Sequence, residues 1–114
     1  MNLKHRIIVQ RMERVITFHL AEPEFNVEKL CAHVELSRMQ ANRLLKRAYG
    51  MSPVAYIKWR RLERAANLIQ IGDLSIQEVG RASGFNSPAY FSKCFKLQFG
   101  CSPSQFLTHK TKQL

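Results

Sequence analysis

The chain has 114 residues, and its 18 Lys and Arg against 8 Asp and Glu give a formal net charge of +10 at pH 7. This length suits one compact domain or two very small ones, and 46% hydrophobic residues suffice for a buried core. So positive a chain favours a polyanionic partner over a cation-binding role. Its apolar runs are too short for a transmembrane helix, and its first residues lack a signal-peptide pattern, so we expect a cytoplasmic protein without membrane contact.

The sequence shows no constellation of side chains for catalysis or metal binding. Cys31, Cys94 and Cys101 form no Cys-x-x-Cys pair, and no zinc site can be written from them and the four histidines. We expect reduced cysteines that act as small apolar residues. No nucleophile motif surrounds any serine, and the five glycines are too scattered for a phosphate-binding loop. We therefore expect no enzyme activity, no metal and no cofactor.

A unit of about thirty residues occurs twice in the chain. The sequence GMSPVAY at residues 50–56 matches GCSPSQF at residues 100–106, and Leu45-Lys46 falls on Phe95-Lys96. If the second copy has one extra residue, the match extends to residues N-terminal of Leu45 in the first copy and of Phe95 in the second. The two copies are separated by residues 57–74.

Capping and turn residues predict about seven helices and no strand. Serine or asparagine precedes most of the predicted helices, proline stands at the first helical position, and glycine follows the last. An apolar stripe at helical spacing marks the first helix. The predicted helices cover about 3–19, 27–33, 38–48, 53–71, 76–83 and 88–99, with a last one from 103 onward.

Each copy combines a short helix, a tight turn and a longer helix, which is a helix-turn-helix arrangement. We predict an all-α, homeodomain-like fold, with one such subdomain at 1–52, a linker helix at 53–71 and the other subdomain at 72–114. The predicted core residues are Leu30, Leu44 and Leu45 in the first copy, and Ile76, Val79, Phe85, Phe91 and Phe95 in the second. Trp59 and the phenylalanines at 99 and 106 are interpreted as core residues too.

The longer helix of each copy leaves basic and hydrogen-bonding side chains exposed, and these can reach base edges and phosphates. The linker helix over 53–70 has a length of roughly 27 Å, which approaches the ~34 Å pitch of B-DNA. One chain can therefore place two helices in successive major grooves without dimerising.

Residues 84–96 (GFNSPAYFSKCFK), followed by residues 100–106, resemble the signature of the AraC/XylS family of bacterial transcription regulators. Arg61-Leu62, Ala65 and Leu68-Ile69 resemble the linker helix of that family, and the resemblance covers about residues 5–107. It implies binding to double-stranded promoter DNA, a role in activating or repressing transcription, contact with RNA polymerase and association with the nucleoid. Any dimerisation would involve parts outside this chain.

The resemblance also assigns roles to individual side chains on the two longer helices. The family's base-reading positions fall on Met39, Asn42, Arg43, Ala89, Ser92 and Lys93, with Tyr90 as an additional candidate. The expected phosphate contacts or their supports are Arg38, Lys46, Arg47, Arg61, Ser87 and Lys96.

The sequence departs from the family pattern at three places, and each departure predicts a structural or functional difference. Glu35 stands where the first turn often has glycine, so we expect that turn to be less tight than the one at Gly84. Gly80 and Ser83 replace small apolar residues, so we expect weaker packing in that helix. Pro88 and Ala89 are poor hydrogen-bonding residues, which suggests that the second copy reads bases less than the first.

Two other functions remain open beside the favoured one. A nonspecific binder of nucleic acid, RNA included, explains the charge but not the repeat. A protein-interaction module would use the stripe Ile8, Met12, Val15 and Ile16 for a partner helix. The resemblance is also compatible with a small stand-alone regulator and with the output module of a longer sensor protein.

Overall fold

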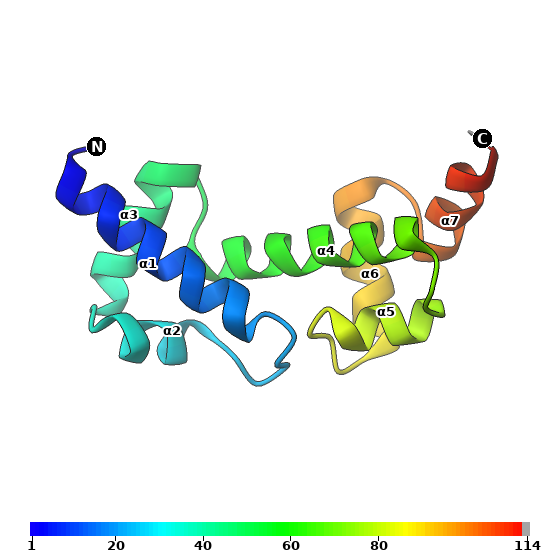
Figure 1. Cartoon of the computed structure of the whole chain (residues 1–114), viewed down its shortest axis with the longest axis horizontal. Helices are drawn as coiled ribbons and strands as arrows, with labels where there is room; N and C mark the ends of the chain where they lie inside the picture. The colour runs from blue at the N-terminus through cyan, green and yellow to red at the C-terminus, as the bar shows by residue number, and fades with distance from the viewer. Residues whose placement is uncertain (113–114) are drawn as a thin grey trace. The chain divides into compact units, whose positions relative to one another are not determined.

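The protein is described by a computed structural model that covers residues 1–112. Over these residues the chain forms seven helices and no strand, which confirms the predicted all-α fold (Figure 1). The helices are α1 (Leu3–His19), α2 (Val27–Val34), α3 (Arg38–Tyr49), α4 (Pro53–Ile71), α5 (Ile76–Ala82), α6 (Pro88–Phe99) and α7 (Pro103–Lys112). None of these helices is both long enough and apolar enough to cross a membrane.

The chain divides into two compact units, Met1–Lys58 and Trp59–Leu114. The boundary falls inside α4, so the first turns of this helix belong to the first unit and the remainder to the second. The three-part division with 53–71 as a separate linker segment stays a prediction.

Local hydrogen bonds fix the helix ends at the predicted residues. Asn26, Ser37, Ser75 and Ser87 each accept a bond from the backbone N–H three residues further on, which satisfies one of the unpaired donors of a first helical turn. The two copies also end their longer helices alike. The N–H groups of Gly50 and Gly100 donate to the carbonyls of Lys46 and Lys96, both at 2.8 Å.

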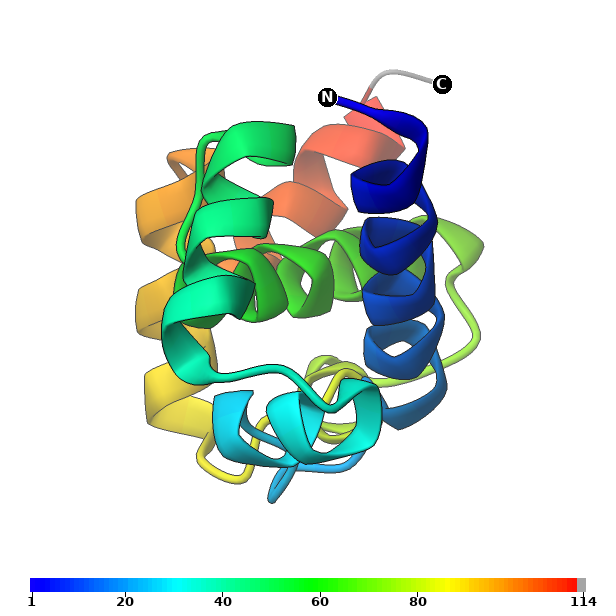
Figure 2. The ribbon, with the colours of Figure 1, turned by 90° about the vertical axis from the view of Figure 1, so that its left-hand side faces the viewer.

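The core of the first unit lies between α1, α2 and α3, which contact one another in pairs. Figure 2 shows α1 and α3 running alongside each other in opposite directions, with α2 crossing at one end. Met12 and Ile16 of α1 are completely buried, as are Leu30 and Leu45, while Ile8 and Val15 are half-buried. The apolar stripe of α1 therefore packs into the core of its own unit, which leaves the protein-interaction hypothesis without its proposed surface.

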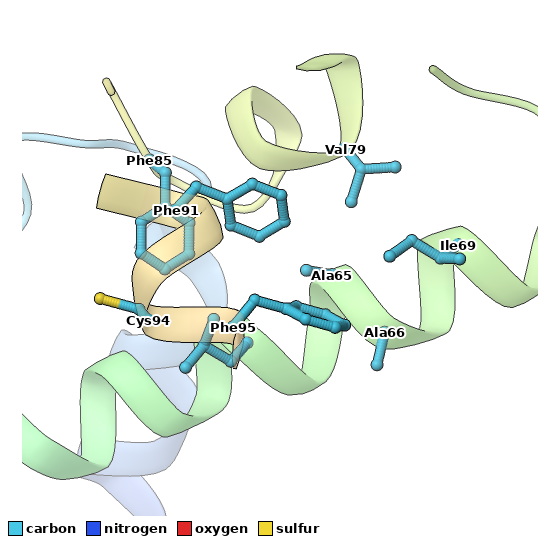
Figure 3. Packing of buried hydrophobic residues seen from close by; sticks show 9 residues of the cluster. Ala65, Ala66, Ile69, Val79, Phe85, Phe91, Cys94 and Phe95 are labelled. Atoms are coloured by element: carbon cyan, nitrogen blue, oxygen red, sulfur yellow. The ribbon is translucent and has the colours of Figure 1, made fainter. Parts of the chain in front are cut away.

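The core of the second unit is built from α4, α5 and α6 around aromatic rings (Figure 3). Ala65 and Ile69 of α4 face Val79 of α5 and the rings of Phe91 and Phe95 of α6 (Figure 3). Phe99 and Phe106 pack against this cluster, and the rings of Phe95 and Phe106 meet edge to face at 5.4 Å. Phe85, Phe91 and Phe95 are thus buried core residues, as predicted, whereas Phe99, Phe106 and Trp59 are half-buried.

The three cysteines are free, and Cys94 is buried in the second core. The part of the chain that the structure describes contains no group of three or more His, Cys, Asp or Glu side chains arranged for a metal.

The turns of the two helix-turn-helix units are closed by equivalent bonds. The N–H of Leu36 donates to the carbonyl of Cys31 at 3.1 Å, and the N–H of Phe85 donates to the carbonyl of Gly80 at 3.0 Å. Glu35 takes the left-handed conformation with φ 56°, and Gly84 has φ 95°. The expectation of a looser first turn is therefore wrong, because Glu35 adopts the backbone conformation that glycine would supply.

The expectation of weaker packing at Gly80 is also wrong. Gly80 is buried, and an added Cβ would lie 2.8 Å from Cδ2 of Phe91. The missing side chain lets the Phe91 ring approach the backbone of α5, so the glycine permits tight packing. Ser83 differs, because it is completely buried and its hydroxyl has no hydrogen-bond partner among the described residues.

Candidate nucleic-acid interface

We call α3 and α6, the second helices of the two helix-turn-helix units, the recognition helices. Successive residues of a helix are rotated by about 100°, so Met39, Asn42, Arg43 and Lys46 share one side of α3. All four are exposed, and Met39 is 69% exposed. The opposite side of the helix is buried in the core. The predicted base-contacting residues of the first unit therefore lie together on one outward face.

Arg38 and Arg47 flank this face at the two ends of α3, and both are exposed. The Nη1 atom of Arg38 lies 3.9 Å from Oε1 of Glu28 on α2. An exposed ion pair of this length contributes little and leaves the guanidinium able to contact a phosphate. The side chain of Gln40 accepts a bond from the Ser37 N–H at 2.8 Å, so this exposed amide serves the cap of α3.

An offset of fifty residues relates the two recognition helices position by position. Ala89, Lys93 and Lys96 are exposed on α6 where Met39, Arg43 and Lys46 are exposed on α3, whereas Ser92 is half-buried. Leu97 occupies the position of Arg47 and is 79% exposed. The basic side chains are Arg38, Arg43, Lys46 and Arg47 on α3, but only Lys93 and Lys96 on α6.

Two polar residues at the start of α6 have local partners. The Ser87 hydroxyl oxygen accepts a bond from the Tyr90 N–H at 3.1 Å, which leaves its O–H free to donate to a phosphate. Tyr90 is 52% exposed. A hydrogen bond with the Cys94 thiol raises the pKa of Tyr90, so its phenol stays neutral at physiological pH.

Arg61, which lies on α4, differs from the other predicted phosphate contacts. It is half-buried and already interacts with other groups of the protein. This environment fits a supporting residue better than a side chain free to contact DNA.

Lys4 and His5 are not among the residues predicted from the sequence, but they share a groove with Arg43 and Arg47 of α3. One feature of the sequence could have identified Lys4 and His5 as candidate anion-binding residues. They stand with Arg6 in the first turn of α1, which contains no acidic residue, although a helix N-terminus disfavours cations.

Comparisons with known proteins agree with this geometry. The helix-turn-helix domain family matches residues 30–109. The HTH-type transcriptional regulator MtrA of Neisseria gonorrhoeae is 38% identical over 85 residues, which cover 75% of this chain and 28% of that protein. A solved transcriptional regulator with an AraC-type DNA-binding domain from Chromobacterium violaceum has a TM-score of 0.84 at 27% identity, with 96% of each chain covered.

The chain belongs to the AraC family. It is a double helix-turn-helix DNA-binding domain of a transcription regulator, as the sequence analysis predicted. The AraC-family domain spans less than half the length of the curated relatives that it matches. The DNA-binding domain of AdpA, solved in complex with a target DNA, matches it with a TM-score of 0.85 at 28% identity, covering 91% of this chain and 93% of that one.

Proposed function

We propose that this AraC-family domain binds a specific promoter sequence on double-stranded DNA as a monomer, with α3 and α6 in successive major grooves. The observation that carries the proposal is the fifty-residue correspondence between the two outward faces. Each unit presents one helix whose inner side is fixed by a core and whose outer side carries exposed polar or basic residues. A helix of this kind is the reading element of helix-turn-helix proteins.

The length of α4 supports binding by one chain. Its 19 residues correspond to roughly 28 Å at ~1.5 Å per residue. Adjacent turns of one DNA groove are ~34 Å apart, and a monomer that reads two of them needs a connection between its reading helices of about that reach. The solved complex of the similar AdpA domain with its target DNA favours the same class of partner.

The side chains divide between reading and positioning. Asn42 and Arg43 are the strongest base readers, because amide and guanidinium groups form paired hydrogen bonds with adenine and guanine edges. Met39 packs on a thymine methyl group. Ala89, Tyr90, Ser92 and Lys93 read bases in the second groove, and Arg38, Lys46, Arg47, Ser87 and Lys96 hold phosphates, with Arg61 as a support.

The two units contribute unequally. Four basic side chains on α3 against two on α6 give the first unit the larger electrostatic part of the affinity. The half-buried Ser92 and the apolar Ala89 make the second unit the weaker reader.

The family supports a wider role for the domain. The domain positions a regulator at a promoter in the bacterial cytoplasm, within the nucleoid, where it contacts RNA polymerase. It carries out no catalytic step.

A binding experiment with two duplexes tests the proposal. One duplex is enriched by the protein from a random pool, and the other has the same composition in shuffled order. We expect tighter binding to the enriched duplex by about 10³-fold or more, with affinity for both falling steeply as salt rises. Equal affinity at physiological salt would refute sequence-specific binding.

Structured RNA of the same length provides the comparison with the nonspecific alternative. RNA affinity near that of the shuffled DNA, together with no enriched duplex, would favour a general nucleic-acid binder.

A further inference from the structure

A groove of about 370 Å³ lies between α1 and the recognition helix α3. Because these helices run in opposite directions, the first turn of α1 lies beside the C-terminal half of α3 (Figure 2). Lys4 and His5 line the groove from α1, and Arg43 and Arg47 line it from α3. Leu44 forms part of its apolar wall. The groove therefore brings together four basic side chains from two elements that are distant in sequence.

These four side chains form no ion pair with any residue that the structure describes. No acidic residue lines the groove, so the protein itself supplies no counter-charge there. Lys4, Arg43 and Arg47 place three cations around one small space, and an anion between them would relieve their mutual repulsion. The groove thus has the electrostatic character of an anion site.

His5 gives an independent indication of a ligand. Its Nδ1 atom is buried and has no hydrogen-bond partner among the described residues. Leaving a buried nitrogen unsatisfied costs free energy, and a small rotation of the ring toward an oxygen ligand in the groove would remove that cost.

The start of α1 points to a negative charge as well. Its first turn contains Lys4, His5 and Arg6 and no acidic residue. Basic residues are unfavourable near the positive end of a helix dipole, whereas an anion is favourable there.

We propose that this groove binds one phosphate of the DNA backbone, with Lys4 and His5 of α1 and Arg47 of α3 as its ligands. The inference rests on the proposed function, because the groove shares Arg43 and Arg47 with the face that contacts DNA. That sharing favours a backbone phosphate over a free anion, since a duplex on the outer face of α3 brings phosphates to its flank. The first unit then holds DNA through α1 as well as through α3.

Three variants test the groove against the enriched and shuffled duplexes at several salt concentrations. Lys4→Ala removes one ligand, and His5→Phe keeps a ring while removing both ring nitrogens. Arg11→Ala is the matched control, because Arg11 is an exposed basic residue of the same helix that does not line the groove.

We expect Lys4→Ala to weaken binding to both duplexes alike by about 3- to 10-fold and to lower the salt slope by about 0.9. His5→Phe weakens binding in the same uniform way without lowering thermal stability. Arg11→Ala changes affinity by less than about two-fold. Equal effects of Lys4→Ala and Arg11→Ala, with wild type still preferring the enriched duplex, would overturn the groove proposal alone. Loss of preference in the wild type would instead refute the proposed function.

Ethylation of individual DNA phosphates identifies the ligand. We expect one phosphate whose ethylation hinders the wild type but not Lys4→Ala. Inorganic phosphate titrated into the free protein, followed through the ring signals of His5, tests the other source. Saturation by phosphate, combined with DNA binding that is insensitive to Lys4→Ala, would assign the groove to a free anion and overturn the proposal.

Discussion

Gly80 of α5 packs directly against the ring of Phe91 of α6, and a Cβ at residue 80 would lie 2.8 Å from Cδ2 of that ring. The three nearest atoms to that Cβ all belong to this ring. Phe91 is almost completely buried, so its ring cannot swing away without opening the second core. The absence of a side chain at residue 80 therefore sets how α6 packs against α5.

Gly80→Ala should destabilise the second unit. Overpacking of a core costs about 1–3 kcal/mol, and the higher helix propensity of alanine offsets up to about 1 kcal/mol of this. We expect a net loss of about 1–2 kcal/mol in the free energy of unfolding, measured by urea denaturation. The double variant with Phe91→Leu should lose less than the sum of the single variants. If the stability loss of the double variant equalled the sum of the two single losses, residues 80 and 91 would not be in energetic contact.

Glu35→Gly should stabilise the first unit. Glu35 has φ 56°, a left-handed conformation that costs an L-residue roughly 1–2 kcal/mol and costs glycine little. The greater freedom of glycine in the unfolded chain offsets part of the gain. We expect about 0.5–1 kcal/mol of added stability by urea denaturation, with Glu24→Gly, at another exposed position, as a control that gives no gain. A decrease in stability would show that the turn does not strain residue 35.

Ser83→Ala should also be stabilising. The hydroxyl of Ser83 is completely buried and unpaired in the part of the chain that the structure describes. An unsatisfied buried polar group costs about 1–3 kcal/mol, and alanine removes it with little change in volume. We expect a gain of about 1 kcal/mol, seen as a higher thermal midpoint. A lower midpoint would mean that the hydroxyl has a hydrogen-bond partner.

The capping box of α5 should make stability depend on pH. Hydrogen bonds from the Ser75 backbone N–H and hydroxyl hold the pKa of Glu78 below its ordinary value of 4.5. A lowered pKa in the folded state stabilises the protein above the unfolded pKa, and this contribution disappears as the pH falls through the folded pKa. Glu78→Gln keeps an accepting oxygen but does not titrate.

The stability advantage of the wild type over Glu78→Gln should therefore shrink as the pH falls below about 4.5, as measured by urea unfolding at a series of pH values. The box of α3, which uses Ser37 and the neutral Gln40, is the internal control, since Gln40→Ala should cost the same stability at each pH. An advantage that stays constant with pH would contradict the role of the Glu78 charge.

Arg43→Ala and Lys96→Ala should affect DNA binding in different ways. Loss of a base-reading guanidinium costs about 1–3 kcal/mol and relaxes the preference at one base position. Loss of a phosphate contact at Lys96 weakens binding to all sequences alike and lowers the salt slope. Binding to duplexes with single-base changes separates the two effects. Finding them interchanged would overturn the assignment of roles.

The helices and most of the core could be predicted from sequence because their signals are local. Ser37, Ser75 and Pro88 mark helix starts through bonds and dihedral angles within a few residues, and apolar spacing identifies Phe91 and Phe95. The repeat also located both recognition helices.

Features that depend on packing between helices could not be predicted in this way. Residue type alone predicted weaker packing at Gly80. The structure shows the opposite, because the Phe91 ring of α6 lies where a Cβ at residue 80 would be. The half-buried state of Ser92 and Arg61 depends on neighbouring elements in the same manner. The groove joins Lys4 to Arg47, two residues that come together only because α1 and α3 are antiparallel.

The most direct test of the central claim is the base pattern of duplexes that the wild-type protein selects from a random pool. A monomer that reads successive major grooves should enrich two blocks whose centres are about 10–10.5 base pairs apart, with the block read by α3 more strongly constrained. A pool without enrichment, or with a single block and no second block at that spacing, would contradict reading of DNA by both recognition helices.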